Sequence, residues 1–381
     1  MKPFDRMYAE VHLDRMKENM EALQANLRPG TMMIGVVKAD GYGHGAVETA
    51  KAIGSYVCGY GVATADEALE LREGGIEKGI LVLGPVDPCR FEEMIRGEIR
   101  PAVFQMDRAE RLSETALRLG KKAKIHLAVD TGMSRIGMAP TEENADLAAE
   151  ISRLPGIELE GMFTHFARAD ETDKTSARKQ MEKFRIFAAM LEKRGIKVPI
   201  CHCSNSAGIL DMKEAGMDAV RAGIAIYGLY PSEEVDRKTV SLKPVMELKS
   251  RITYIKEISA GTEVSYGGTF TAEAPMRIAT VSAGYGDGYP RSLSGRGQVL
   301  ICGRRARILG RICMDQFMAD VTEIPDAAEG SKVTLLGRDG KEEITMEELA
   351  GCSGKFLYEI PCGIGKRVPR VYLHGETGSG D

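Results

Sequence analysis

The fold of this 381-residue chain follows from the stretch Val36-Val37-Lys38-Ala39-Asp40-Gly41-Tyr42-Gly43-His44-Gly45. The apolar run 32–37 predicts a buried strand, and Lys38 stands at its end, directly before a glycine-rich turn. Burying an amine costs free energy. Such a lysine therefore either keeps its head in solvent or serves chemistry that needs an amine with a lowered pKa. The stretch alone leaves both interpretations open, and the rest of the chain decides between them.

Strand-like apolar runs recur along the chain, separated by amphipathic stretches that mostly end in glycine. The clearest predicted helix spans 175–194 and stops at Gly195, and another, over 13–27, precedes the first strand. The predicted strands are 32–37, 59–64, 80–84, 101–104, 125–130, 159–166, 200–204 and 220–228. Eight parallel strands joined by helices predict an N-terminal (β/α)8 TIM-like barrel. A doubly wound open sheet is the alternative, but eight short units in a row favour closure.

After Tyr230-Pro231 the sequence becomes rich in Val, Ile, Thr and Gly, with turn signals at short intervals, which predicts a mostly β C-terminal domain. Its clearest predicted strands are 248–258, 276–283, 298–301, 306–309 and 332–336. We therefore predict a barrel over 1–235, a β-rich domain over 236–374 and a disordered tail over 375–381. The charged and polar segment 233–241 is the predicted linker.

The composition excludes several classes of protein. A formal net charge of −4 gives no reason to expect nucleic acid or an anionic membrane as partner. No run approaches the ~18 apolar residues of a membrane span, and the N-terminus has no secretory signal, so a cytoplasmic location is expected. The eight scattered cysteines are then expected to be reduced. No metal site is predicted at Cys201-His202-Cys203, because alternate strand residues point to opposite faces.

Polar residues gather where the predicted barrel strands end. They are Lys38 and Tyr42 after the first strand, Asp130, Thr131 and Arg135 after the fifth, His165 at the end of the sixth, Asn205 and Ser206 after the seventh, and Arg221, Gly223 and Ile224 in and after the eighth. Residues at this end of such a barrel face the active site, so their coincidence favours a chemical role for Lys38. The last two loops offer a hydroxyl and small residues around which backbone N–H groups can bind a phosphate. An amine beside a phosphate site suggests pyridoxal phosphate held as a Schiff base.

Each of these residues also has a structural interpretation. His165 alone is more often a hydrogen-bonded core histidine, Asn205 and Ser206 could cap a helix, and Arg135 could brace a turn through Asp130. Arg221 is the hardest to explain structurally, because a guanidinium in an apolar strand is costly without a partner. In the β-rich domain, tyrosines beside glycines could pack at strand edges, or one could act as a base near cations.

The whole chain resembles the alanine racemases, which are fold-type III pyridoxal-phosphate enzymes. The motifs that carry the resemblance occur in the family's order: 37–45, 130–135, Thr164-His165-Phe166, Asn205-Ser206, Arg221-Ala222-Gly223, Ser265-Tyr266-Gly267, Gly284-Tyr285, Cys313-Met314-Asp315 and Tyr358-Glu359. The resemblance implies a barrel followed by a β domain, working as a head-to-tail homodimer with shared active sites. It implies racemisation of L- and D-alanine by two bases, which supplies D-alanine for peptidoglycan.

The resemblance also implies residue roles. Lys38 would hold the cofactor and act on the D face of the substrate, and Tyr266 of the partner subunit would act on the L face. Arg221 would sit against the pyridine nitrogen, supported by His165. The implied phosphate ligands are Tyr42, Ser206, Gly223, Ile224 and Tyr358. The implied substrate residues are Arg135, Met314 and Tyr285.

One position departs from the family pattern. Many members carry a carbamylated lysine seven residues before the equivalent of Arg135, and here that residue is Ala128. Something else must therefore orient Arg135, or Ala128 simply packs. The alternative functions are a racemase that prefers serine or another amino acid, a fold-type III decarboxylase, and a non-catalytic pyridoxal-phosphate carrier. Arg221 argues against the decarboxylase, since those enzymes pair the pyridine nitrogen with an acid, and the β domain argues against the carrier.

Overall fold

The computed structural model describes residues 6–375 and divides into two compact units. One unit spans Arg15–Lys243, and the other combines Met1–Asp14 with Pro244–Asp381. No helix in the described range is both long and apolar enough to cross a membrane.

The unit Arg15–Lys243 is a closed barrel of eight parallel strands, as predicted. The strands are β2 (Met32–Val36), β3 (Gly59–Val62), β4 (Gly79–Val82), β5 (Ile99–Val103), β6 (Ala123–Ala128), β7 (Ile157–Phe163), β8 (Ile200–His202) and β9 (Ala219–Ala222). β2 closes the barrel by pairing with β9, which places Ile34 opposite Arg221. The predicted eighth strand, 220–228, is too long. At Gly223 the backbone leaves the extended conformation, and a 3₁₀ helix follows over Ile224–Tyr227.

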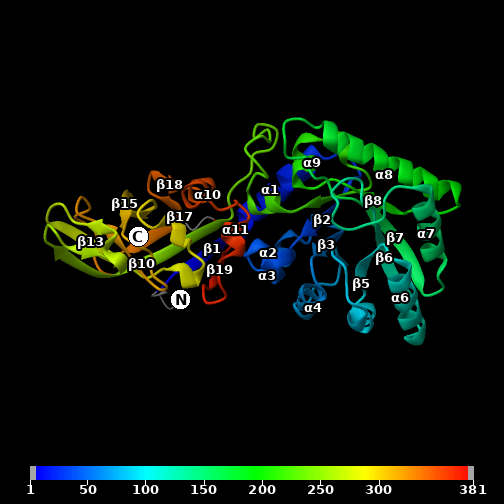
Figure 1. Cartoon of the computed structure of the whole chain (residues 1–381), viewed down its shortest axis with the longest axis horizontal. Coiled ribbons are helices and arrows are strands. Elements are labelled where there is room, and N and C mark those ends of the chain that lie inside the picture. Colours follow the sequence, from blue (N-terminus) through cyan, green and yellow to red (C-terminus); the bar gives the residue numbers. More distant parts are fainter. Residues whose placement is uncertain (1–5, 376–381) are drawn as a thin grey trace. The chain divides into compact units, whose positions relative to one another are not determined.

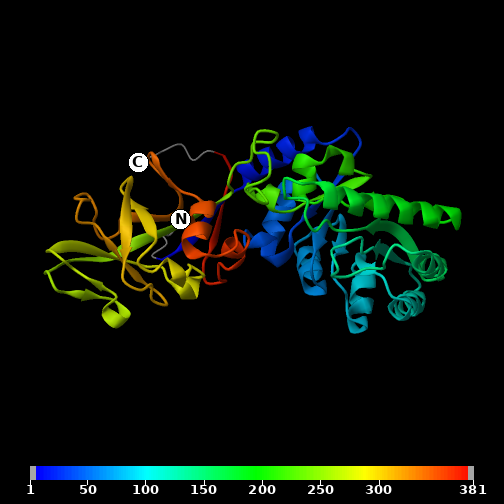
Figure 2. The same cartoon turned by 45° about the horizontal axis from the view of Figure 1, so that its top comes forward.

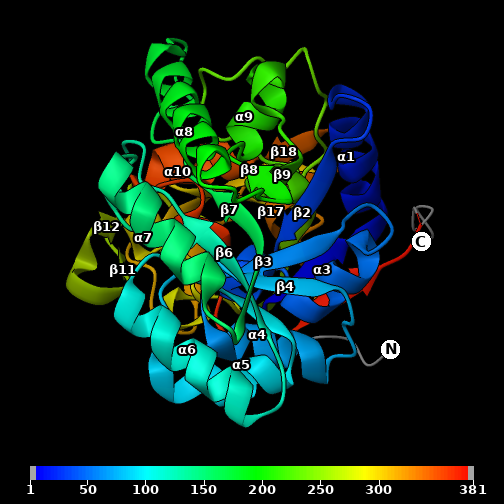
Figure 3. The same ribbon diagram turned by 90° about the vertical axis from the view of Figure 1, so that its right-hand side faces the viewer.

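Helices flank the barrel strands (Figure 3). They are α1 (Leu13–Asn26), α2 (Lys38–Tyr42), α3 (Ala46–Ile53), α4 (Ala65–Glu73), α5 (Phe91–Arg96), α6 (Met106–Arg118), α7 (Glu142–Arg153), α8 (Thr175–Lys193) and α9 (Ser206–Asp211). The long helix α8, green in Figure 2, buries the predicted apolar face that includes Phe184 and Phe187. It ends before Gly195, whose φ of 76° suits glycine.

The second unit is mostly β. Its large sheet has the strand order β18-β17-β14-β15-β16-β13-β10-β1-β19, and β17 also pairs with β10, which closes part of the sheet into a ring. These strands are β1 (Tyr8–His12), β10 (Met246–Ile258), β13 (Met276–Val281), β14 (Gln298–Ile301), β15 (Arg304–Leu309), β16 (Phe317–Asp320), β17 (Lys332–Asp339), β18 (Glu342–Ile344) and β19 (Arg370–Leu373). A two-stranded sheet, β11 (Glu263–Val264) with β12 (Phe270–Thr271), and the helices α10 (Met346–Ser353) and α11 (Glu359–Cys362) complete the unit.

Residues 6–14 belong to the β-rich unit and not to the barrel, which differs from the predicted division of the chain. Strand β1, blue in Figure 1, runs antiparallel to β10 and parallel to β19. Ala9 and Val11 on this strand are fully buried, so the pairing also buries apolar surface. Short chain segments at a terminus carry no sign of their distant partners, and for this reason the sequence did not reveal the placement.

The second boundary also lies elsewhere than predicted. The segment 233–241 falls within the barrel unit, whose last residue is Lys243. Its neighbour Tyr230 donates its hydroxyl to the carbonyl of Val240 at 2.8 Å and accepts from the N–H of Leu242 at 3.1 Å. These bonds fold the segment back on itself. Of the predicted tail 375–381, Gly375 is described, and 376–381 lie outside the described residues.

Candidate active site

Lys38 begins a turn whose backbone is left-handed. The four residues that follow it, 39–42, all have φ between 52° and 59°. This conformation costs a non-glycine residue roughly 1–2 kcal/mol, so surrounding contacts must stabilise it. Within the turn, Gly41 donates its N–H to the Val37 carbonyl, and Gly45 donates to the Asp40 carbonyl, both at 2.8 Å. The half-buried Lys38 therefore extends from a turn of fixed shape.

Two carboxylates hold this turn. Asp40 Oδ1 accepts the N–H of Ala46 at 2.9 Å, which fastens the turn to the start of α3. Glu67 accepts the N–H of Ala39 at 2.8 Å through Oε1 and that of Ala63 at 2.7 Å through Oε2. Glu67 thus joins the loops that follow β2 and β3. Sequence analysis missed this role; the only signal was the capping box that Glu67 forms with Thr64 at the start of α4.

The predicted phosphate residues of the barrel lie together. Ser206 Oγ accepts the N–H of Gly223 at 2.9 Å and that of Ala225 at 3.3 Å, which ties the loop after β8 to the loop after β9. A Cβ on Gly223 would lie 3.1 Å from the hydroxyl of Tyr42 and 3.7 Å from Ser206 Oγ. The absence of a side chain at this position therefore leaves a small cradle lined by two hydroxyls. Asn205 caps α9 by accepting the Gly208 N–H at 3.0 Å.

Arg221 is buried without a carboxylate partner among the described residues, and it is satisfied by neutral acceptors. Its Nη1 donates to His202 Nδ1 at 2.6 Å and to the His202 carbonyl at 3.0 Å. Its Nη2 donates to the Thr164 carbonyl at 2.6 Å and to the Cys203 carbonyl at 3.1 Å. Burial lowers the pKa of Arg221 to about 10, so it stays protonated at neutral pH. Within residues 6–375 its Nε–H has no hydrogen-bond acceptor.

A chain of hydrogen bonds runs from Arg221 through the barrel. A guanidinium can only donate, so His202 must accept at Nδ1 and carry its proton on Nε2. Nε2 of His202 lies 2.9 Å from Nδ1 of His126, whose own Nε2 lies 3.3 Å from Glu160 Oε2. Glu160 also accepts from Arg100 at 2.9 Å. Arg221 thus determines which atom donates and which accepts in every hydrogen bond of this chain as far as Glu160.

Both histidines of this chain are held neutral. Burial places the pKa of His202 well below its ordinary value, and the positive charge of Arg221 adds to the effect. Burial also lowers the pKa of His126, although Glu160 opposes the shift. For Glu160, burial would raise the pKa, but the hydrogen bonds from His126 and Arg100 outweigh it and hold the pKa low. Sequence analysis missed this chain because its members come from different strands and share no motif.

His165 lies beside Arg221, as expected, with its Nδ1 3.4 Å from Nη2. Burial, together with the charges of Arg221, Arg135 and Lys38, lowers its pKa to about 3. His165 is therefore neutral at physiological pH. Its carbonyl accepts a hydrogen bond from Gln180 Nε2 on α8 at 3.0 Å.

Arg135 is exposed and makes no hydrogen bond or ion pair with the described residues. Asp130 does not brace it: Oδ1 of Asp130 accepts the N–H groups of Gly132 at 2.9 Å and Ser134 at 3.0 Å, which shapes the turn instead. Ala128 is buried in an apolar cluster with Ala102 and Phe163. It therefore packs, and does not orient Arg135.

The remaining predicted residues belong to the β-rich unit. Tyr266 follows Ser265, whose Oγ donates to the Arg311 carbonyl at 2.6 Å. Tyr285 and Met314 lie on loops joined by a hydrogen bond from the Gly286 N–H to the Met314 carbonyl at 2.9 Å. Tyr266, Tyr285 and Met314 are 70%, 40% and 53% exposed. The half-buried Tyr358 stacks on Phe356, with 4.8 Å between ring centroids.

Comparisons with known proteins identify the family to which the chain is similar. The sequence model of the alanine racemase N-terminal domain matches residues 11–231, and that of the C-terminal domain matches 245–372. Alanine racemase of Clostridium perfringens is 45% identical over 368 residues, covering 96% of this chain and 95% of the relative. That of Desulforamulus reducens is 42% identical over 368 residues, covering 96% and 99%.

Solved structures give the same result. Alanine racemase of Clostridium difficile matches with a TM-score of 0.93 and 40% identity, covering 97% of this chain and 96% of that chain. Alanine racemase of Bacillus anthracis, solved with bound L-Ala-P, matches with a TM-score of 0.91 and 36% identity, covering 98% and 96%.

Proposed function

The chain belongs to the alanine racemase family, and from this premise we propose that it interconverts L-alanine and D-alanine with pyridoxal 5′-phosphate as cofactor. The main support is that three features lie at the same end of the barrel. They are the amine of Lys38, the small space beside Gly223 that is lined by two hydroxyls, and the buried guanidinium of Arg221, which has no carboxylate partner among the described residues. Each of these features suits one part of that cofactor. We also propose a cytoplasmic enzyme that supplies D-alanine for peptidoglycan.

The residues present fit the cofactor. The space beside Gly223, which a Cβ would fill, suits a phosphate bound by Tyr42, Ser206 and the backbone N–H of Ile224. Arg221 would offer its Nε–H to the ring nitrogen, since its terminal nitrogens already donate to the protein. When bound, pyridoxal phosphate supplies an aldehyde that condenses with an amine and a ring that withdraws electrons from Cα.

Arg221 sets the electronic character of the site. A guanidinium donates a hydrogen bond but cannot accept a proton, so it does not favour a protonated ring nitrogen as a carboxylate would. With Arg221 as its partner, a bound ring would withdraw electrons less strongly than with an acid. This property of Arg221 would favour the return of a proton to Cα, which racemisation needs, over side reactions.

Racemisation requires a proton carrier on each side of Cα. We assign Lys38 Nζ to the D face and the phenol oxygen of Tyr266 from a second copy of the chain to the L face. The exposure of Tyr266, Tyr285 and Met314 supports this, because large apolar or aromatic side chains that are exposed suit an interface. The proposed assembly is a homodimer in which each site draws residues from both subunits.

Other residues would bind and position the substrate and the cofactor. Arg135, which the described residues leave without a partner, would bind the substrate carboxylate, and Met314 of the partner would lie near the same group. Tyr285 and Tyr358 would restrict the space for the side chain. Tyr358 would also contribute to the phosphate site, and Asn205 would hold the start of α9 through its cap.

A racemase that prefers serine is the second candidate, because one added hydroxyl is discriminated by only about 1–3 kcal/mol. A chiral assay with alanine, serine, lysine and arginine, with and without added pyridoxal phosphate, separates the candidates. We expect yellow protein, dependence on the cofactor and the highest kcat/KM for alanine. Replacing Lys38 by Ala should abolish both the colour and the activity. Retention of full activity would contradict the assignment.

A further inference from the structure

The loops that carry Tyr285 and Met314 are built against each other. Besides the bond from Gly286 to Met314, the N–H of Tyr285 donates to the Cys313 carbonyl at 3.1 Å. The two backbones are so close that a Cβ on Gly284 would lie 2.3 Å from the Met314 carbonyl oxygen. The positions of Tyr285 and Met314 are therefore coupled through the main chain.

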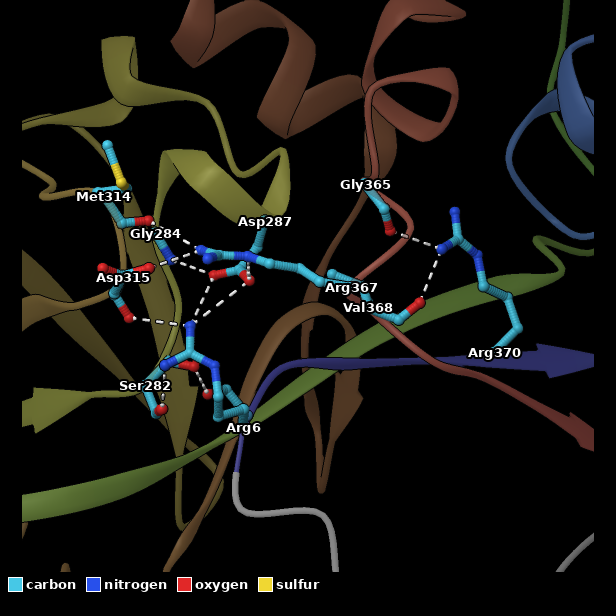
Figure 4. A network of polar contacts seen from close by, with 11 residues as sticks. Arg6, Ser282, Gly284, Asp287, Met314, Asp315, Gly365, Arg367, Val368 and Arg370 are labelled. Atoms are coloured by element: carbon cyan, nitrogen blue, oxygen red, sulfur yellow. Dashed lines mark hydrogen bonds and ion pairs between the residues drawn. The ribbon is translucent and has the colours of Figure 1, made fainter.

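A buried carboxylate lies behind this pair of loops. Asp287 is 2% exposed, and its Oδ2 accepts the N–H of Gly284 at 2.8 Å. Two arginines reach it from different parts of the chain: Arg6 Nη2 lies 3.2 Å from Oδ2, and Arg367 Nε lies 2.7 Å from Oδ1 (Figure 4). A buried carboxylate is stable only with such partners. Each carboxylate oxygen of Asp287 is thus paired with a positively charged arginine, and these pairs hold the first loop.

The same arginines also hold the second loop. Arg367 Nη2 donates to the Met314 carbonyl at 3.2 Å and to Asp315 Oδ1 at 2.8 Å. Arg6 Nη2 donates to the Asp315 carbonyl at 3.3 Å. Each guanidinium therefore spans from Asp287 in one loop to residues 314–315 in the other, as Figure 4 shows. Arg6 lies outside both stretches that match the family, 11–231 and 245–372.

We propose that Asp287, with Arg6 and Arg367, forms a positioning clamp that sets the placement of Tyr285 and Met314 for substrate binding. The proposal rests on the proposed function, because it takes these two residues to contact alanine. Asp287 itself touches neither substrate nor cofactor. It acts through the two loops, and the N-terminal segment reaches the substrate site by way of Arg6.

The Asp287→Asn variant tests the clamp. The amide keeps the shape of the side chain, but it removes the carboxylate that pairs with Arg6 and leaves Arg367 with only the charge of Asp315. We expect KM for L- and D-alanine to rise about tenfold, with kcat reduced by less than about threefold. The ratio of kcat/KM for serine to that for alanine should rise about threefold, since looser loops discriminate less. The yellow absorbance of the bound cofactor should not change, because its proposed ligands in the barrel are intact.

Arg305→Gln provides the matched control. Arg305 lies in the same unit and donates to Glu342 at 2.8 Å and Glu348 at 2.6 Å, but has no contact with either loop. We expect its KM values and substrate ratio to match those of wild type, whatever the loss in melting temperature. If both variants change KM in proportion to their melting temperatures, the effect is general loss of stability and the clamp is refuted.

If Asp287→Asn does not fold, Arg6→Gln and Arg367→Lys replace it. Both leave Asp287 one intact arginine, and each should raise KM by about threefold; unchanged KM in both would overturn the clamp. The wild type separates the two proposals. Failure of the wild type to racemise alanine refutes the proposed function, whereas an active wild type with unaltered variants refutes only the clamp.

Discussion

Arg221 donates a hydrogen bond from Nη1 to Nδ1 of His202 across 2.6 Å in the interior of the barrel. This bond fixes the tautomer of His202, which then donates to His126. A protonated His202 could not accept a hydrogen bond from Arg221, so this bond requires the imidazole of His202 to be neutral. The charged guanidinium of Arg221, at the proposed ring-nitrogen site, therefore requires His202 to stay unprotonated.

Stability should fall as the pH drops below about 6.5. The pKa values of His126, His165 and His202 are lowered in the folded chain, and that of His165 is about 3. Below the ordinary histidine pKa of about 6.5, the unfolded chain binds more protons than the folded one, so protonation favours unfolding. Each histidine contributes a loss of up to about 1.4 kcal/mol per pH unit, reached where it is protonated in the unfolded chain and neutral in the folded one.

Urea unfolding at pH 7.5, 6.5 and 5.5, at fixed protein and cofactor concentrations, measures this loss. A His202→Gln variant can still accept from Arg221 and should show a shallower slope. His374→Gln, which alters an exposed histidine, should keep the wild-type slope. A urea midpoint that stays constant over this pH range would contradict the conclusion that these histidines are neutral in the folded chain.

Replacing Tyr266 by Phe should affect the two enantiomers unequally. If the phenol serves only the L face, exchange of the Cα proton of L-alanine with solvent deuterium should slow more than that of D-alanine. General acid–base groups contribute about 10²–10⁴-fold, which sets the expected size of the loss. NMR of deuterium wash-in for each enantiomer measures it. Equal losses would count against two separate bases.

Two inactive variants should complement each other if the site is shared. In a mixed dimer of Lys38→Ala and Tyr266→Phe subunits, one site receives both defects and the other receives neither. Mixing the purified variants under conditions that allow subunit exchange should restore up to about a quarter of wild-type activity, because about half of the dimers are mixed and each has one intact site. No recovery, despite proven exchange, would place both residues of a site in one subunit.

Arg135→Gln should weaken substrate binding without destabilising the fold. The side chain is exposed and bonded to no described residue, so its loss should shift the free energy of unfolding by less than about 0.5 kcal/mol. A charge-assisted bond to a carboxylate contributes about 1.5–3 kcal/mol, equivalent to at least a tenfold rise in KM. Steady-state kinetics and thermal unfolding test both statements. A large loss of stability with unchanged KM would show a structural role.

Glu67→Ala should loosen the turn that carries Lys38. The variant leaves the N–H groups of Ala39 and Ala63 without their acceptor, at a cost of about 1–3 kcal/mol for a buried group and less where water enters. Cofactor dissociation, followed by the loss of yellow absorbance after dilution, should accelerate. Glu70→Ala, on the exposed face of the same helix, is the control. Identical dissociation rates in the two variants would exclude a role for Glu67 in holding the turn.

The sequence determined the elements whose pattern is local. The barrel strands are short, mostly apolar segments bounded by turn signals, and α8 shows its apolar face at helical spacing, so these were predictable. The clustering of Lys38, Ser206 and Arg221 was also predictable, because the carboxyl ends of parallel barrel strands meet at one end.

Tertiary structure alone decided the rest. The pairing of β1 with β10 and β19 joins segments more than 230 residues apart, and no local pattern encodes that partner. The left-handed turn after Lys38 depends on Glu67 from another loop, and the buried chain from Arg221 to Glu160 depends on which strands are neighbours. Hydrogen bonds between side chains require atoms within about 3.5 Å, and only the folded chain sets those distances.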